Sequence, residues 1–141
     1  MRGKTISNAL IIVPVSLLRS WENEAFMIIK KKCVPNIQIS VVSSDMSRDR
    51  RIRILREAIQ CNYNNPSLVI TTYGLIGGDY SMDFRAEGYP WDYVILDEGH
   101  KIKNTSTKVA KNCRYICNDE STRRILLTGT PIMNNLIGKL T

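Results

Sequence analysis

The chain has 141 residues, a length typical of one domain of ~100–200 residues. It carries 20 Lys and Arg residues against 13 Asp and Glu residues, which gives a net charge of +7, and 43% of its residues are hydrophobic. This composition excludes a disordered tail and a collagen-like repeat. No apolar run approaches the ~18–20 residues that a bilayer helix needs, so no membrane span is predicted.

The charge is divided into three blocks along the chain. Residues 1–60 have a net charge of +6, residues 61–100 of −5 and residues 101–141 of +6. Basic flanks suit a polyanion such as nucleic acid, but an ordinary solvated surface has the same composition. The charge pattern alone leaves both interpretations open.

Short apolar runs predict five strands that alternate with helices. The strands are expected at residues 9–13, 37–42, 67–71, 93–97 and 124–128. The helices are expected at residues 16–28, 47–59, 73–76 and 105–116, with N-caps at Ser16, at Ser47 and at Thr105 or Ser106. This alternation predicts an α/β fold, a parallel sheet with helices on both faces.

The cysteines are irregularly spaced and no secretory signal is seen, which argues against a disulfide framework. Cys113 and Cys117 lie four residues apart, but a zinc site would need further ligands, and His100 is the only histidine. We expect buried free thiols and a reducing compartment.

Polar segments follow four of the predicted strands, at residues 14–16, 71–73, 97–100 and 128–131. In parallel sheets, ligands bind beyond the carboxyl ends of the strands, so these segments are the candidate functional site.

Two adjacent carboxylates, Asp97 and Glu98, end the fourth predicted strand. In nucleotide hydrolases, the first acid of such a pair holds Mg²⁺, usually through water, and the second polarises the attacking water. A pair that only forms caps and surface ion pairs has the same local sequence. The fifth strand ends in residues 128–131, whose hydroxyls can bond to the acidic segment or form a plain turn.

Four segments, in order, closely resemble motifs of the Snf2 family of DNA-dependent ATPases, which are superfamily 2 motor proteins. Asp97–Asn104 resembles motif II, Leu126–Leu136 resembles motif III, Ile12–Leu18 with Trp21 and Glu24 resembles motif Ia, and Ile70–Tyr73 resembles motif Ib. Trp91–Leu96 and Ser106–Lys108 are most similar to the excision-repair (Cockayne syndrome B-like) branch. The resemblance runs from about Ala9 to Leu136 and implies a RecA-like lobe of a P-loop NTPase.

The resemblance also implies roles for individual residues. Asp97 would be the acid of the Mg²⁺ site and Glu98 the acid that orients the hydrolytic water. Residues that couple the nucleotide state to the grip on DNA would be His100, Thr128, Gly129 and Thr130, and residues that contact the DNA backbone would be Ser16, Thr71 and Thr72. The implied cofactors are ATP and Mg²⁺, and the implied partners are double-stranded DNA, chromatin or repair proteins, and a second RecA-like lobe, in the nucleus.

The chain departs from the family pattern at three places. Gly99 stands where the family usually has Ala, and Met133 where it usually has Gln. Gly3, Lys4 and Thr5 resemble the end of the phosphate-binding motif I, but only two residues precede them, and the next predicted strand follows without the ~12 or more residues that a crossover helix needs.

We therefore expect residues 1–141 to form a partial first RecA-like lobe with a truncated motif I and no second lobe. Such a chain alone should bind ATP weakly or not at all. A missing central strand should leave the edges of the neighbouring strands unpaired, which favours aggregation. Two other functions remain open: a non-catalytic DNA-binding or scaffold remnant, and an RNA helicase. RNA helicases of this type typically carry Ser-Ala-Thr in motif III, unlike residues 128–130.

Overall fold

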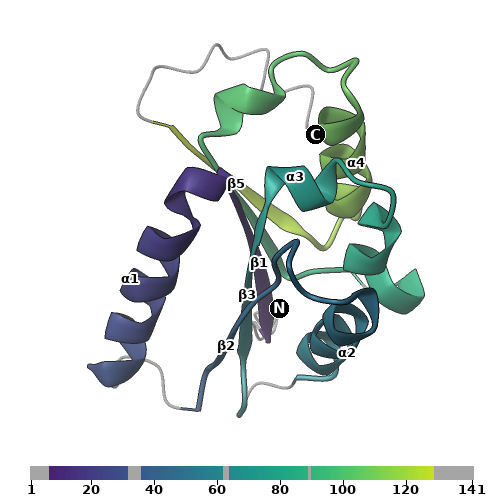
Figure 1. The fold of residues 1–141 in the computed structure, drawn as a ribbon. Coiled ribbons are helices and arrows are strands. Elements are labelled where there is room, and N and C mark those ends of the chain that lie inside the picture. The colour runs from purple at the N-terminus through teal and green to yellow at the C-terminus, as the bar shows by residue number, and fades with distance from the viewer. Residues whose placement is uncertain (1–6, 32–35, 62–63, 89, 129–141) are drawn as a thin grey trace.

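The computed structural model describes residues 7–31, 36–61, 64–88 and 90–128. Five strands in this part of the chain form one parallel sheet in the order β2-β3-β1-β4-β5 (Figure 1). They are β1 (Asn8–Val13), β2 (Gln38–Val41), β3 (Ser67–Thr72), β4 (Tyr93–Asp97) and β5 (Arg123–Leu127). The five predicted strands are confirmed, and each end lies within one residue of the expected position.

Helices cover the sheet on both faces, as predicted (Figure 1). One face carries α1 (Leu18–Lys30), and the other carries α2 (Arg48–Ile59), α3 (Tyr73–Ile76) and α4 (Lys108–Cys117). Three 3₁₀ helices complete the described elements: η1 (Val15–Leu17), η2 (Ser81–Gly88) and η3 (Gly99–Ile102). No helix in the described ranges is long and apolar enough to cross a membrane.

The apolar run of β1 is continuous because both of its faces are covered. Leu10 and Ile12 pack in the larger core with residues of α2, α3 and α4. Ile11 and Val13 point to the other face, where they pack with Ala25 of α1. The strand β1 is therefore packed on both of its faces, which fixes the position of its carboxyl end.

The N-caps agree with the sequence prediction at one helix and differ at two. Ser47 caps α2 as expected, because its hydroxyl accepts from Arg50 N. Ser16 does not cap a helix: it lies inside η1, whose N-cap is Pro14. The predicted caps at Thr105 or Ser106 are also wrong.

Thr107 caps α4, and its hydroxyl accepts from Ala110 N. Ser106 is bonded to Asn104 instead of capping the helix. The Oδ1 atom of Asn104 accepts from the amide of Ser106 at 3.1 Å and from its hydroxyl at 2.6 Å. The side chain of Asn104 thus forms a turn of its own and delays the helix start.

The two strands that lead into the candidate site are joined at their opposite ends by Asp92. Its carboxylate accepts from Ser7 N (2.8 Å), Ser7 Oγ (3.0 Å) and Asn8 N (3.2 Å), and Asn8 Oδ1 accepts from Asp92 N (2.8 Å). Asp92 is buried, so these bonds satisfy a charge that would otherwise be costly. They hold the starts of β1 and β4 in register.

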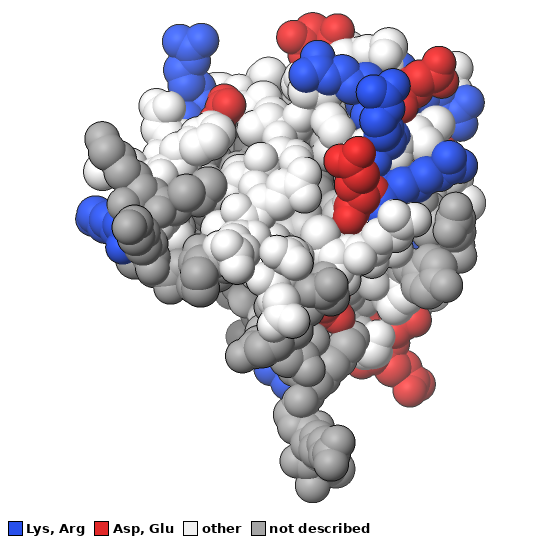
Figure 2. All heavy atoms as spheres, turned by 90° about the horizontal axis from the view of Figure 1, so that it is seen from below, with Lys and Arg blue, Asp and Glu red and all other residues white. Residues whose placement is uncertain are grey.

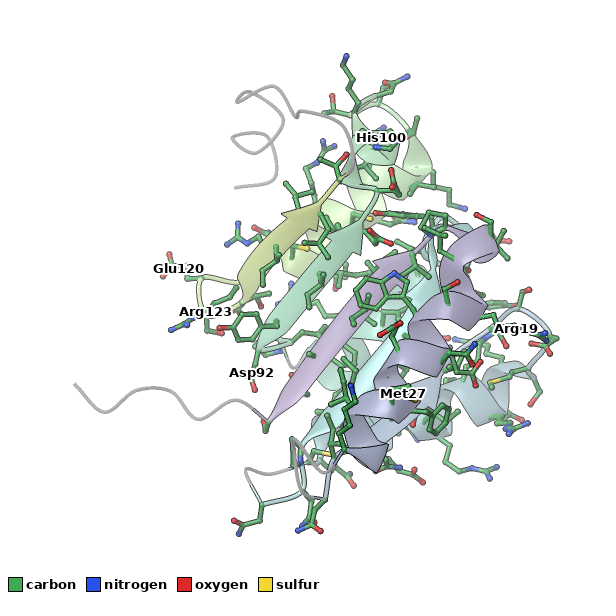
Figure 3. The ribbon with its side chains drawn as sticks, turned by 90° about the vertical axis from the view of Figure 1, so that its left-hand side faces the viewer. Arg19, Met27, Asp92, His100, Glu120 and Arg123 are labelled. Atoms are coloured by element: carbon green, nitrogen blue, oxygen red, sulfur yellow. The ribbon has the colours of Figure 1, made fainter. Side chains whose placement is uncertain are left out.

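Among the described residues, no helix covers β4 and β5 on the α1 side of the sheet (Figure 3). Figure 3 shows α1 lying beside β4 and β5 rather than over them. Alternate residues of β5 are exposed there, and Ile125 and Leu127 each retain 38% of their accessible surface. Among the described strands β5 is also the last in the sheet order, so it combines an edge with an apolar face.

The basic residues of the first charge block include the five arginines of α2, which lie away from the strand ends that carry the candidate site. Arg48 pairs with Asp83 at 3.0 Å and stacks on the ring of Tyr80 at 4.2 Å. Acidic Asp49 and Glu57 also lie exposed on this helix. Figure 2, seen from the side of the strand amino ends, shows positive and negative side chains intermixed. This helix therefore fits a solvated surface.

Cys113 and Cys117 are buried free thiols, as predicted. Burial raises the pKa of Cys113 well above its usual range and raises the pKa of Cys117 to about 11. We expect iodoacetamide to modify Cys61 in the folded chain but to reach Cys113 and Cys117 only on unfolding, because the thiolate is the reactive form. Peptide mapping by mass spectrometry with and without urea measures this difference, and equal labelling in the two conditions would contradict it.

Candidate functional site

The predicted polar segments meet at the carboxyl edge of the sheet. Val13 of β1 is in register with Thr72 of β3, and Asp97 of β4 with Leu127 of β5. Because all five strands are parallel, the segments that follow them emerge on the same side. The residues from 129 onward lie outside the described part of the chain.

Asp97, the last residue of β4, is held by three other residues. Its Oδ2 accepts from the indole Nε1 of Trp21 at 2.7 Å, and its Oδ1 accepts from Glu98 N at 3.0 Å. Its carbonyl oxygen accepts from the hydroxyl of Tyr73 at 2.6 Å. Burial raises the pKa of Tyr73 above its usual value, so this phenol remains a donor. The carboxylate therefore has a defined orientation.

Glu98 occupies a left-handed backbone conformation, with φ 53° and ψ 45°. This conformation is unfavourable for a residue with a Cβ, at a cost of ~1–2 kcal/mol, and such strain is often found at functional sites. It turns the chain from β4 into η3. The Glu98 side chain is 32% exposed, and its Oε2 lies 3.1 Å from His100 Nδ1.

His100 connects the ends of β4 and β5. Its Nδ1 lies 3.1 Å from Glu98 Oε2 and 3.3 Å from Thr128 Oγ1. The structure thus brings together three residues that the sequence placed at two strand ends: Glu98, His100 and Thr128. The acid contacts the imidazole, and the imidazole contacts the hydroxyl that follows β5.

Gly99 allows η3 to lie close to β5. A Cβ built on Gly99 would lie 2.4 Å from Leu126 Cδ2, closer than any ordinary contact. Gly99 stands where the Snf2 family usually has Ala. In this structure the glycine accommodates the side chain of Leu126.

We expect Gly99→Ala to lower the free energy of unfolding by about 0.5–1.5 kcal/mol, the usual cost of moving a side chain, here that of Leu126, away from its preferred rotamer. Leu126→Ala in the same chain should remove the clash, so the two substitutions should be non-additive. Urea denaturation of the four proteins of this cycle measures the coupling. Gly74→Ala is the matched control, because its Cβ would make only an ordinary 3.8 Å contact with Thr72 Oγ1. Additive losses would contradict this explanation.

The residues expected to contact DNA differ in their accessibility. Ser16 is exposed in η1. Thr71 is fully buried and its hydroxyl donates to the carbonyl of Val42 at 2.9 Å, so the expected contact of its side chain with DNA does not fit the structure. Thr72 is 6% exposed, and its hydroxyl accepts from Leu75 N as the N-cap of α3. This bond uses a lone pair of the hydroxyl and leaves its proton to donate, so the expected contact of Thr72 with DNA stays a prediction.

Five residues of the sequence-predicted site lie outside the described part of the chain: Gly3, Lys4, Thr5, Gly129 and Thr130. The structure adds two residues to the site, because both donate hydrogen bonds to Asp97, a role that the motifs did not predict for them: Trp21 and Tyr73. Both lie within segments that resemble motifs Ia and Ib, but their convergence on Asp97 depends on strand order.

The acidic residues fit a magnesium–nucleotide site better than an all-protein metal site. In the described ranges, no group of three or more His, Cys, Asp or Glu side chains could hold a metal ion. Asp97 and Glu98 are partly exposed oxygen donors. Mg²⁺ typically binds one or two carboxylates together with phosphate oxygens and water, so this donor set suits it.

Comparison with known proteins agrees with the fold and the motifs. Residues 2–139 match the SNF2-related domain, and the chain belongs to this family. Its five-stranded parallel sheet with helices is the RecA-like fold of the SNF2 ATPase core. In structure it is similar to the Sulfolobus solfataricus SWI2/SNF2 ATPase core in complex with dsDNA, with a TM-score of 0.60 and 28% identity over 96% of this chain and 24% of that one.

Curated relatives include proteins named for DNA repair and for helicase activity. The chain is 38% identical to the human DNA excision repair protein ERCC-6-like, over 93% of this chain and 10% of that protein. It is 36% identical to the DNA repair protein RAD5 of Kluyveromyces lactis, over 90% and 10%. It is 32% identical to the ATP-dependent DNA helicase DDM1 of Arabidopsis thaliana, over 90% and 15%. The chain therefore spans about a tenth of the length of the relatives it matches.

Proposed function

We propose that the chain is part of the first RecA-like lobe of an ATP-dependent double-stranded DNA translocase that acts in DNA repair or chromatin remodelling in the nucleus. The observation that carries this proposal is the contact of Glu98, His100 and Thr128 beside Asp97 at the carboxyl edge. The similarity to an ATPase core bound to double-stranded DNA supports DNA as the polymer.

In this function the two acids have separate tasks. Asp97 would hold Mg²⁺ through water, and Glu98 would accept a hydrogen bond from the attacking water and orient it. At this site the metal would supply positive charge that offsets the charge of the phosphates. His100 and Thr128 transmit the state of Glu98 to the end of β5, together with Gly129 and Thr130.

The remaining contacts come from the edges of the lobe. Ser16 donates to a DNA phosphate, a contact that positions the duplex without reading its sequence. Gly3, Lys4 and Thr5 are the remaining end of a truncated phosphate-binding motif I, and a second RecA-like lobe would close over the nucleotide. Chromatin or repair proteins are the proposed further partners.

The test is ATP hydrolysis by the protein in its longest naturally expressed form, measured alone, with duplex DNA and with duplex RNA. We expect duplex DNA to stimulate hydrolysis and duplex RNA not to stimulate it. Tight binding to duplex DNA without any hydrolysis would instead identify a scaffold remnant, and equal or greater stimulation by RNA would identify an RNA helicase. Either result would overturn the proposal.

A further inference from the structure

Trp21 is the one side chain outside the β4 turn that the structure bonds directly to the Asp97 carboxylate in the described residues. Its indole N–H donates to Oδ2 at 2.7 Å, from a helix 76 positions away in sequence. This is a charge-assisted bond, shorter and stronger than a bond between neutral groups. It ties α1 to the end of β4.

The chemistry of the indole suits it to hold an acid rather than to exchange protons with it. Trp carries a single N–H donor of fixed direction and no acceptor. The second carboxylate oxygen of Asp97 is already set by Glu98 N. Each oxygen can accept a further bond, so the two donors fix the plane of the carboxylate and leave lone pairs for a cation or its water.

Trp91 provides an internal comparison. Its indole donates to the carbonyl of Phe84 at 2.6 Å, and its side chain is fully buried in the larger core. It makes the same kind of bond to a neutral acceptor away from the candidate site. A loss of Trp91 should thus affect folding without any effect on Asp97.

We propose that Trp21 is a positioning residue for the proposed magnesium site: its indole N–H holds the Asp97 carboxylate in the orientation in which it receives Mg²⁺. This inference rests on the proposed role of Asp97. Loss of the bond frees the carboxylate to rotate, so the affinity for Mg²⁺ falls while the water-orienting acid Glu98 is unchanged.

The first test compares Trp21→Phe with Trp91→Phe in the longest expressed form of the protein. Trp21→Phe should raise the Mg²⁺ concentration for half-maximal ATP hydrolysis about tenfold, which corresponds to the loss of one hydrogen bond to a charged group. The rate at saturating Mg²⁺ should change little. Trp91→Phe should leave the Mg²⁺ requirement unchanged. An unchanged requirement in Trp21→Phe would overturn the inference.

The second test needs no activity. In the ¹⁵N-labelled 141-residue chain, the two indole N–H signals are assigned by their loss in the Phe variants. Asp97→Asn should shift the Trp21 signal and leave the Trp91 signal in place, because only the Trp21 indole donates to this carboxylate, whereas Trp91 donates to the carbonyl of Phe84. An unshifted Trp21 signal, or equal shifts of the two signals, would refute the positioning role.

The two proposals fail in different ways. If Asp97→Asn retains Mg²⁺-dependent hydrolysis, the proposed function of Asp97 is wrong. If Asp97→Asn abolishes hydrolysis and Trp21→Phe has a normal Mg²⁺ requirement, the proposed function stands and the inference on Trp21 is wrong.

Discussion

Replacing Glu98 by Gln should lower the rate of ATP hydrolysis by about 10²–10⁴-fold, the usual contribution of a positioned acid or base. Glutamine has the same shape but cannot polarise the attacking water. ATP binding should be retained, because the amide removes no contact to the phosphates in the proposed site. Hydrolysis under saturating ATP and equilibrium binding of ATP to the longest expressed form measure the two effects separately.

The backbone of Glu98 supplies a second variant that separates chemistry from folding. Glycine adopts the left-handed conformation without strain, so Glu98→Gly should raise the free energy of unfolding by about 1 kcal/mol while hydrolysis is lost. Glu57→Gln on the exposed surface of α2 is the matched control and should change neither quantity. Full hydrolysis by Glu98→Gln would rule out the proposed role of this acid.

The exposed apolar residues of β5, which is the last strand of the described sheet, should cause the 141-residue chain to associate with itself. A strand edge with unpaired backbone groups readily adds another strand, and Ile125 and Leu127 provide an exposed apolar surface beside it. We expect the mean mass in solution to rise with protein concentration. Ile125→Lys should reverse this rise, because a charge on an edge strand opposes pairing.

Sedimentation velocity over a range of concentrations measures the association. The control is Phe26→Lys on α1, where the apolar side chain is 51% exposed, more than that of Ile125, but lies on a helix. Equal effects of the two substitutions would indicate general surface hydrophobicity instead of strand pairing. A wild-type chain that stays monomeric at every concentration would contradict the prediction outright.

The sheet could be predicted because five buried strands leave five short apolar runs, and the helices between them leave a different spacing of apolar residues. The helix starts were harder to predict, since several hydroxyls compete for the same role. Ser106 is a good cap by composition, but Asn104 binds its amide and hydroxyl first, and the helix begins after Thr107.

Part of the candidate site could also be predicted from a local pattern of residues. The positions of Asp97, Glu98, His100 and Thr128 follow from the rule that functional groups gather after parallel strands, and the structure brings them to one edge. Thr71 obeys the same rule in sequence, yet its hydroxyl is turned into the sheet and bonds to Val42. A pattern of residue types does not specify which way a strand-end side chain points.

By itself, the sequence determined the class of the fold, the motif acids and their family, because these depend on local apolar runs and on residue types at short spacing. Only the tertiary structure decided that Trp21 reaches Asp97 and that Gly99 must admit Leu126. Both contacts join segments that are distant in the chain. They exist because β4 lies between β1 and β5 in the sheet, an order that no local pattern encodes.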